Sequence, residues 1–266
     1  MRGIFCRESF KESSTTLSPL LSLPLFVKLL SLEIHSRIAP LYVKSPQLII
    51  FAAMAQKKLL RFAQLKTLEN VKEYPEGMPG KWKEFFKNDS PVVLERACGR
   101  GEYTAGLAAM HPGSNFLGVD VKGNRMYLGA KYAIDNKLQN AGFLRTQIEM
   151  LGDYFAPGEV DEIWITFPDP QPQLSREKKR LTSPRFLNMY QPTLKEGGCV
   201  NLKTDNDGLY EYTVDKIAEL KLPLHIQTDD LYHSEFADEV LSIKTYYEKK
   251  YLKDNKNINY VKFSFQ

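Results

Sequence analysis

Glycine and carboxylate residues stand where several short apolar runs of this 266-residue chain end. Ligands of an open α/β sheet bind beyond the carboxyl ends of its strands, so these residues are the first candidates for a binding site. The positions are Glu95, Gly99 and Gly101, Asp120, Gln147 or Glu149, Asp169, and Asp205. Most of them carry a carboxylate, which is unusual for a phosphate site. The set instead predicts a ligand with hydroxyl and amine donors and a positive charge.

The turn at residues 95–101 (ERACGRG) separates two interpretations of the cofactor. A dinucleotide site favours GxGxxG, because its third glycine permits close packing of helix on sheet, and this chain has Thr104 there. An acidic residue that opens the turn would also repel a pyrophosphate. S-Adenosylmethionine has a sulfonium, an amino group and two ribose hydroxyls, which Glu95 and Asp120 can bind while the glycines let the backbone approach. A glycine turn that serves only the strand-to-helix geometry remains the simpler alternative.

A second motif, residues 167–170 (FPDP), follows a buried apolar run. Its two prolines restrict the backbone and hold Asp169 at the strand tip, where a structural turn would more simply use glycine or asparagine. A basic cluster at 178–180 (KKR) follows. A fixed carboxylate beside a basic cluster predicts that a polyanion is brought to a reactive site. The alternative is that the cluster is only a solvated charged surface.

Short apolar runs alternate with helix-like stretches from Pro91 onward, which is typical of a parallel sheet covered on both faces. The expected strands are 92–94, 115–119, 143–148, 162–167 and 199–203, with a final strand pair at 225–228 and 260–265. Residues 54–90 have no strand signal. We expect them to form a helical or irregular lead-in, with Trp82, Phe85 and Phe86 packed on the core. The predicted fold class is therefore α/β, with a mostly parallel sheet.

Residues 1–53 differ from the rest of the chain. They are rich in Ser and Leu, and their apolar run is broken by Pro19 and Pro24. That pattern predicts neither a signal peptide nor a membrane span, which needs ~18 apolar residues. Met54 opens a sequence typical of a cytosolic amino terminus. We therefore expect 1–53 to be a dispensable extension or an over-extended gene start, and 54–266 to be the folded domain.

Charge and cysteine usage limit the function further. The chain has 36 basic and 32 acidic residues, and six basic and three acidic residues lie in 1–53. The remainder is nearly neutral, so nucleic-acid binding cannot be inferred from the net charge. Three cysteines are odd in number and far apart, which suits a reducing compartment, and no Cys/His spacing predicts a metal site. We expect a cytoplasmic protein with no bound metal and no membrane contact.

Two shorter motifs complete an ordered set: Thr204-Asp205 after the fifth expected strand, and residues 245–248 (TYYE) near the C-terminus. In this order the segments resemble the bacterial tRNA (guanine-N7-)-methyltransferase family, whose pattern is ExGxGxG, an acidic residue after the second strand, FPDPWxKxRHxKRR, TD and TxxE. The match extends from Met54 to the end and is most specific at 167–181. The chain has Ala97, Gln171, Gln173, Ser175 and Arg176 where the family has Gly, Trp, Lys, Arg and His.

The resemblance implies a Rossmann-like class I methyltransferase fold, with an antiparallel strand near one edge of the sheet, that binds S-adenosyl-L-methionine. The expected cofactor contacts are Glu95, Gly99, Gly101, Asp120, Gln147 and Asp169. Asp169 is also the expected catalytic residue, and the expected substrate contacts are Gln173, Asp205, Thr245, Tyr246, Tyr247 and Glu248. The implied reaction is methylation of guanine N7 at position 46 in the variable loop of tRNA, by a monomer or a homodimer. A methyltransferase with another substrate and an RNA-binding module with a decayed cofactor pocket remain as alternatives.

Overall fold

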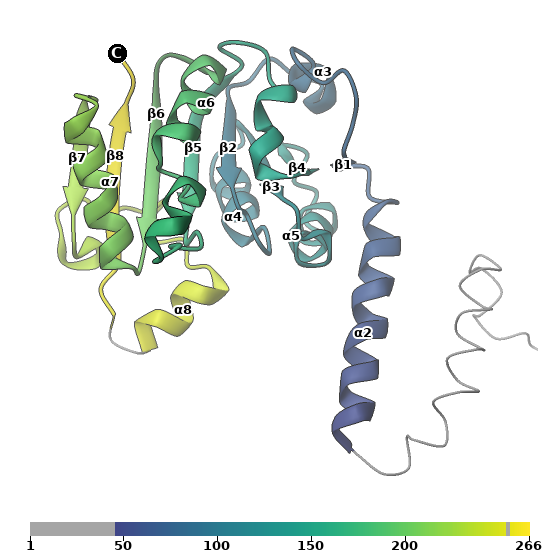
Figure 1. Ribbon diagram of the computed structural model, residues 1–266. Helices are drawn as coiled ribbons and strands as arrows, with labels where there is room; N and C mark the ends of the chain where they lie inside the picture. Colours follow the sequence, from purple (N-terminus) through teal and green to yellow (C-terminus); the bar gives the residue numbers. More distant parts are fainter. Residues whose placement is uncertain (1–45, 254–255) are drawn as a thin grey trace, which may run out of the picture. The chain divides into compact units, whose positions relative to one another are not determined.

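The computed structural model describes residues 46–253 and 256–266. Within these residues, eight strands form one sheet (Figure 1) in the order β1-β4-β3-β2-β5-β6-β8-β7. The strands are β1 (Val71–Glu73), β2 (Val92–Arg96), β3 (Asn115–Asp120), β4 (Ala141–Arg145), β5 (Val160–Thr166), β6 (Leu194–Thr204), β7 (Leu224–Thr228) and β8 (Asn259–Ser264). By its internal contacts the chain divides into residues 1–56 and 57–266, and the sheet belongs to the second unit.

The sheet is parallel from β1 across to β6, whereas β8 is antiparallel to both of its neighbours, β6 and β7. The expected mostly parallel sheet with an antiparallel strand near one edge is therefore confirmed. The strand order reverses at β2, because β3 and β5 lie on its two sides. Such a reversal opens a crevice at the carboxyl ends of the strands, where ligands of this class of fold bind.

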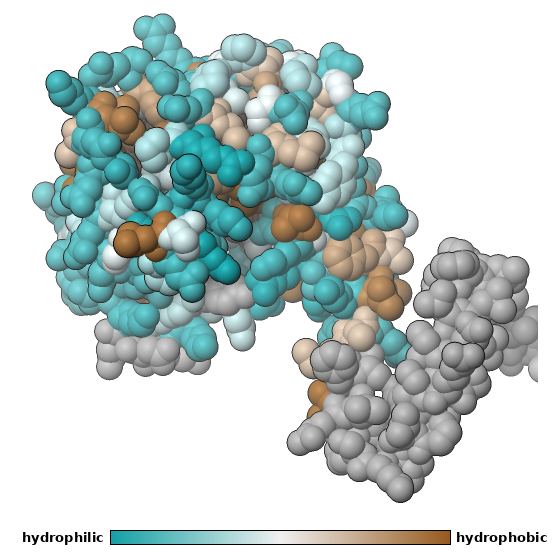
Figure 2. All heavy atoms as spheres, in the orientation of Figure 1, coloured by the Kyte–Doolittle hydropathy of each residue, from teal (hydrophilic) through white to brown (hydrophobic). Residues whose placement is uncertain are grey.

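Helices α4 (Glu102–Met110) and α5 (Gly123–Asp135) cover one face of the sheet, and α6 (Pro184–Thr193) and α7 (Asp207–Glu219) cover the other, with α3 (Trp82–Phe86) in the same core (Figure 1). The described residues also include α2 (Pro46–Leu65), α8 (Tyr246–Lys253) and the short 3-10 helices η2 (Ile148–Asp153), η3 (Leu174–Lys179) and η4 (Leu231–His233). Val93 joins the core under α4 and α5, whereas Leu94 joins the core under α3, α6 and α7. Successive strand residues point to opposite faces, so the apolar run of β2 supplies both cores. The outer surface over α6 and α7 is mainly hydrophilic (Figure 2), as expected of helices that bury one face.

Residues 71–73 form a strand that the sequence did not predict. β1 is three residues long, pairs with β4 and contains one apolar residue, which is too few for a periodic signal. The rest of the lead-in packs as expected, because Trp82 and Phe86 are buried in the core and Phe85 packs against it. Nε1 of Trp82 donates to the carbonyl of Tyr154 at 2.8 Å, which fixes the lead-in to the segment after β4.

Two expected strands differ from the structure by more than two residues at one end. The strand expected at 143–148 ends at Arg145, and the residues from Ile148 onward form η2. The strand expected at 199–203 begins earlier, at Leu194, so that Gly197 and Gly198 lie inside β6. The register of β5 and β6 shifts beside these glycines, and such an irregularity accommodates residues that would otherwise interrupt a strand.

The predicted N-terminal extension lies largely outside the described residues, which begin at residue 46. Helix α2 crosses the expected boundary at Met54, and the start at this residue remains a prediction. In the part of the chain that the structure describes, no helix is both long and apolar enough to cross a membrane.

Candidate active site

The carboxyl ends of five parallel strands bring the predicted residues to one edge of the sheet. Glu95 lies in β2, Asp120 ends β3, Gln147 follows β4, Asp169 follows β5, and Asp205 follows β6. Neighbouring strands are aligned at this edge, since Glu95 pairs with Gly118 of β3 and with Trp164 of β5. Residues that are far apart in the sequence therefore lie along the crevice that the reversed strand order opens.

Glu95 is a buried acid that accepts three hydrogen bonds. Its Oε2 accepts the amide of Thr104 at 2.8 Å and the hydroxyl of the same residue, and its Oε1 accepts the hydroxyl of Thr166. Burial raises the pKa of Glu95 from 4.5 to about 7; the three donors oppose this shift, and the charge of Asp120 adds to it. A carboxyl group with such a pKa favours a cation beside it, because the cation stabilises the ionised form.

The turn between β2 and α4 contains three residues with a left-handed backbone: Ala97 (φ +57°), Gly99 (φ +55°) and Gly101 (φ +69°). A Cβ on Gly101 would lie 2.5 Å from the ring of Phe143 and 3.2 Å from Cα of Gly129, so this glycine is required for packing. A Cβ on Gly99 would meet nothing nearer than 3.8 Å, which leaves space for a ligand beside its backbone. Gly101 is therefore needed for the packing of the turn, whereas the backbone of Gly99 is open to a ligand.

Asp120 is fixed by two backbone amides at the end of β3. Its Oδ2 accepts the amide of Gly99 at 2.9 Å, and its Oδ1 accepts the amide of Lys122 at 2.7 Å. Each carboxylate oxygen has more than one lone pair, so both can accept a further donor. Two adjacent hydroxyl groups, such as those of a ribose, match this pair of acceptors.

Gln147 and Glu149 are both exposed beyond the end of β4. The carbonyl of Ile148, which lies between them, accepts Nη2 of the buried Arg96 at 2.8 Å. This hydrogen bond ties the segment after β4 to the end of β2, beside Glu95. Both exposed side chains can face a ligand at this edge.

Asp169 lies in a strained turn that two prolines stiffen. The residues on either side, Phe167 (φ +47°) and Gln171 (φ +46°), have a backbone conformation that L-residues rarely adopt. Oδ1 of Asp169 accepts the amide of Gln171 at 3.2 Å, and the residue is exposed. The amide of Phe167 donates to the carbonyl of Lys203 at 2.8 Å, which joins the turn to β6. Strain of this kind persists only where the surroundings impose it, and it is concentrated at functional sites.

Arg180 supports the turn around Asp169. Its Nε donates to the carbonyl of Gln171 at 3.2 Å, and its guanidinium lies 4.3 Å from the ring centroid of Tyr212. The interpretation of residues 178–180 as one cluster facing a polyanion is therefore wrong for Arg180, because its side chain is buried. Lys178 and Lys179 are exposed.

Comparison with known proteins identifies the family. Residues 89–261 match a family model described as "Putative methyltransferase". A tRNA (guanine-N(7)-)-methyltransferase of Bacteroides fragilis is 47% identical over 219 residues, which cover 79% of this chain and 86% of that protein. The protein of the same name from Cytophaga hutchinsonii is 45% identical over 218 residues, covering 80% and 99%. The chain belongs to the tRNA (guanine-N7-)-methyltransferase family.

The crystal structure of the 16S rRNA methyltransferase KamB has a similar fold, with a TM-score of 0.54 and 16% sequence identity. The similarity covers 70% of this chain and 93% of that one. At this identity the likeness concerns the fold alone, and it confirms the class I methyltransferase fold that the resemblance implies.

Two of the expected substrate contacts of this methyltransferase lie after β5 and β6. Gln173 is exposed at the start of η3. Asp205 directly follows β6, and its Oδ2 lies 3.4 Å from Nζ of Lys256. Both therefore lie on the side of the sheet that carries Asp169, and their contact with a substrate remains a prediction.

The family motif TxxE forms a capping box at the start of α8. The amide of Thr245 donates to Oε2 of Glu248 at 3.2 Å, and the amide of Glu248 donates to the hydroxyl of Thr245 at 3.2 Å. Oε1 of Glu248 lies 2.8 Å from Nζ of Lys203, and both side chains are fully buried. In this structure the carboxylate of Glu248 is engaged by the protein itself rather than presented to a ligand.

Tyr246 lies beside the turn that follows β2. Its amide donates to Oε2 of Glu102 at 2.7 Å, and the guanidinium of Arg100 lies 4.6 Å from the centroid of its ring. The start of α8 is therefore joined to the start of α4, next to Gly99. The side chain of Tyr247, the other tyrosine of the motif, lies outside the described residues.

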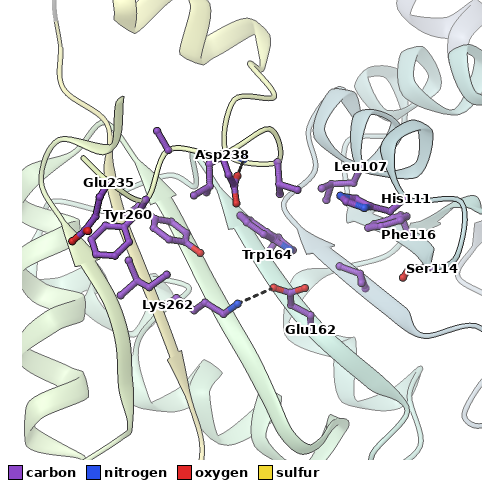
Figure 3. A pocket seen from close by; sticks show the side chains of 16 residues that line it. Leu107, His111, Ser114, Phe116, Glu162, Trp164, Glu235, Asp238, Tyr260 and Lys262 are labelled. Atoms are coloured by element: carbon purple, nitrogen blue, oxygen red, sulfur yellow. Dashed lines mark hydrogen bonds and ion pairs between the residues drawn. The ribbon is translucent and has the colours of Figure 1, made fainter. Parts of the chain in front are cut away.

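A separate cavity of about 580 Å³ lies on the same face of the sheet as α4 (Figure 3). Trp164 and Tyr260 line it, and Nζ of Lys262 lies 3.9 Å from Oε1 of Glu162 within it. Ser114, which precedes β3, also lines the cavity, so it extends toward the amino ends of the parallel strands. It is therefore distinct from the edge that carries Asp120 and Asp169. Among the described residues no group of three or more His, Cys, Asp or Glu side chains could hold a metal ion.

The sequence did not identify the residues that position the predicted ones. They are Thr104 and Thr166 at Glu95, Arg180 at the Asp169 turn, and Lys203 at Glu248. In the sequence, Thr104 was noted only because the dinucleotide pattern has glycine at this position. In the structure its hydroxyl donates a hydrogen bond to Glu95, the acid that opens the turn. No spacing signal pointed to Lys203, because its partners come from a distant part of the chain.

Proposed function

We propose that this chain transfers a methyl group from S-adenosyl-L-methionine to N7 of a guanine in tRNA, at position 46 of the variable loop. The observation that carries the proposal is that Glu95, Asp120 and the strained Asp169 turn meet at one edge of the sheet, in a chain of this family. Because the proposed substrate is tRNA, we also expect the enzyme to act in the cytoplasm.

The residues of this edge fit the cofactor. Glu95 favours a cationic group, because burial raises its pKa to about 7 and a neighbouring positive charge stabilises the carboxylate. Asp120 retains acceptors for two ribose hydroxyls, and the backbone beside Gly99 is open. A pyrophosphate would instead face two carboxylates. When bound, S-adenosylmethionine supplies a methyl group on a positively charged sulfur.

The chain needs few chemical groups for this reaction. Guanine N7 has a lone pair and no proton, so no general base is required. Asp169 can stabilise the positive charge that develops on the guanine, and the stiff turn holds its carboxylate in place before the reaction. Asp169 and Asp205 can also accept hydrogen bonds from guanine N1–H and the N2 amino group, which adenine lacks. Correct placement of the reactants can contribute up to about 7–11 kcal/mol.

Exposed lysines of η3 and α8 supply the contacts with the tRNA backbone in this proposal. Lys178 and Lys179 lie in η3, and Lys249 and Lys250 lie in α8. Phosphate contacts of this kind contribute affinity and orientation without reading sequence. The nearly neutral net charge does not oppose this role, because a local basic surface determines phosphate binding.

The test is transfer of a tritiated methyl group from S-adenosylmethionine to bulk tRNA, followed by nucleoside analysis. The proposal expects 7-methylguanosine, and it expects no label on a tRNA transcript in which adenine replaces guanine 46. Cofactor binding without labelled RNA would favour a methyltransferase of another substrate. RNA binding without cofactor binding would favour a module whose cofactor pocket has decayed.

A further inference from the structure

Lys203 is a buried cation at the carboxyl end of β6, and the proposed reaction gives its charge no chemical task. Its side chain has no exposed surface, and its Nζ lies 5.6 Å from the ring centroid of Tyr103 and 6.0 Å from that of Phe167. Burial lowers the pKa of Lys203, and the charge of Glu248 opposes the shift. A buried charge of this kind requires partners with suitable geometry.

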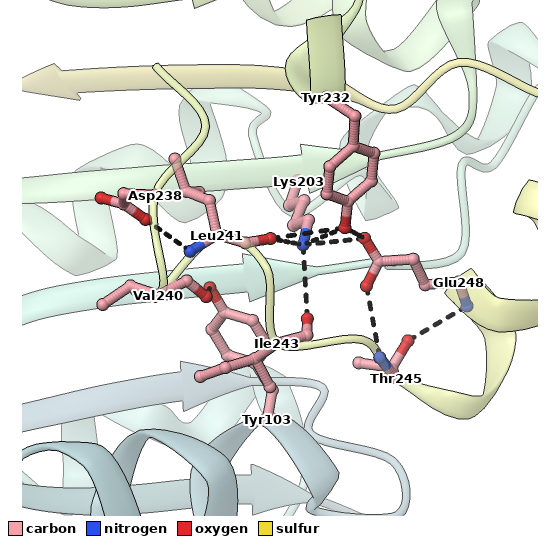
Figure 4. A network of polar contacts seen from close by, with 9 residues as sticks. All are labelled: Tyr103, Lys203, Tyr232, Asp238, Val240, Leu241, Ile243, Thr245 and Glu248. Carbon is pink, nitrogen blue, oxygen red and sulfur yellow. Dashed lines mark hydrogen bonds and ion pairs between the residues drawn. The ribbon is translucent and has the colours of Figure 1, made fainter. Parts of the chain in front are cut away.

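All the polar partners described for Nζ of Lys203 belong to one segment, residues 231–252 (Figure 4). Nζ donates to the carbonyl of Leu241 and, at 3.4 Å, to that of Ile243; it lies 3.3 Å from the hydroxyl of Tyr232 and 2.8 Å from Oε1 of Glu248. The hydroxyl of Tyr232 also donates to Glu248. One side chain of the sheet therefore engages the segment at four separate points along its length.

The 231–252 segment has little regular structure other than η4 and α8. It contacts α4 at other points, where the hydroxyl of Tyr103 donates to the carbonyl of Val240 at 3.1 Å and Ile243 packs against Gly106. The segment contains the TxxE motif, which the family resemblance assigns to substrate contact. Its placement at the sheet edge therefore determines where those residues lie.

Lys203 also connects to the proposed catalytic residue through its backbone. Its carbonyl accepts the amide of Phe167 at 2.8 Å, two residues before Asp169. The side chain of Lys203 thus fixes the 231–252 segment, while its main chain fixes the Asp169 turn. A shift of one relative to the other requires that one of these contacts break.

We propose that Lys203 is a positioning residue that, paired with Glu248, holds the 231–252 segment in register with the Asp169 turn so that the tRNA guanine is presented to the cofactor. The proposal rests on the proposed function for its substrate. Glu248 acts through this pair and not by touching the guanine. Replacing one of the two residues alone is therefore expected to impair the enzyme, whereas replacing both with apolar residues is expected to restore much of its activity.

The test compares Lys203→Met, Glu248→Leu and the double variant in the full chain. Removal of one member leaves the other charge buried and unpaired, whereas removal of both leaves an apolar contact. We expect each single variant to lower kcat/KM for tRNA by about 100-fold and to speed hydrogen exchange in residues 231–252. We expect the dissociation constant for S-adenosylmethionine to change less than about threefold, because most of the expected cofactor contacts lie at the ends of β2, β3 and β4.

The double variant decides between positioning and direct contact. Recovery of kcat/KM by at least about tenfold over both single variants, together with slow exchange in the segment, supports the proposal. Slow exchange with activity as low as that of Glu248→Leu would overturn it, because Glu248 would then contact the substrate itself. Wild-type activity of Lys203→Met would also overturn it.

Two further measurements complete the test. Lys195→Met, which removes the Lys195–Asp161 ion pair at the amino end of β6, controls for the loss of an ion pair elsewhere in the sheet, and we expect it to leave hydrogen exchange in 231–252 unchanged. If the wild-type chain labels no tRNA, the proposed function fails. Hydrogen exchange in the single and double variants then still tests whether Lys203 and Glu248 hold the segment as a pair.

Discussion

Replacement of Glu95 by glutamine is expected to stabilise the protein at neutral and alkaline pH while it weakens cofactor binding. The folded-state pKa is about 7 and the reference value is 4.5, so between these values the folded chain binds more protons than the unfolded chain. Rising pH therefore favours unfolding through this group. The difference in pKa corresponds to about 3 kcal/mol of destabilisation above pH 7, and about 2 kcal/mol of it develops between pH 5 and pH 7.

The assay is urea denaturation of the wild type and Glu95→Gln at several pH values from 5 to 8. Glutamine has nearly the same shape and can still bond with Thr104 and Thr166, so the variant removes the charge and little else. Glu211→Gln, at an exposed position of α7, is the matched control. Unfolding free energies of Glu95→Gln and wild type that stay parallel over this range would refute the reasoning.

The raised pKa of Glu95 also predicts how cofactor binding depends on pH. A cation beside Glu95 lowers its pKa, so binding below pH 7 releases a proton from the wild type. The affinity for S-adenosylmethionine is then expected to rise by up to about tenfold per pH unit as the pH approaches 7, and to be independent of this group in Glu95→Gln. Calorimetric titration at pH 6 and pH 8 measures the affinity and the proton release for the wild type and for Glu95→Gln. An equal pH dependence of the affinity in the two proteins would contradict a cation at this site.

Three further changes test the remaining parts of the site. Ala97→Gly is expected to raise the unfolding free energy by about 0.5–1 kcal/mol in denaturation experiments, because glycine relieves the strain of a left-handed φ at some cost in chain entropy. A lower unfolding free energy would contradict this account. Asp169→Ala is expected to lower the single-turnover methylation rate by about 100-fold or more and to leave tRNA affinity within about threefold. Weaker tRNA binding at an unchanged methylation rate would contradict the role of Asp169. Replacement of Lys178 and Lys179 by alanine is expected to reduce the salt dependence of tRNA binding by about one logarithmic unit per phosphate contact, whereas Lys195→Ala, at the amino end of β6, leaves it unchanged.

Much of the fold could be predicted from local patterns. Apolar runs that end at glycine or acidic residues gave strands near β2, β3 and β5, because buried parallel strands are continuously apolar and ligands bind where they end. β1 escaped prediction because pairing with β4, and not its own composition, makes it a strand. The early start of β6 at Leu194 likewise depends on its pairing with β5.

The roles of the site residues divide in a similar way. Residue type and spacing predicted which carboxylates lie at the carboxyl ends of the strands, because strand tips of a parallel sheet share an edge whatever the packing around them. Only the tertiary structure decided that Glu95 has a raised pKa, that Arg180 supports a turn and that Glu248 faces Lys203. Burial, hydrogen-bond partners and charge pairs depend on atoms contributed by distant segments, and no local pattern of one chain specifies them.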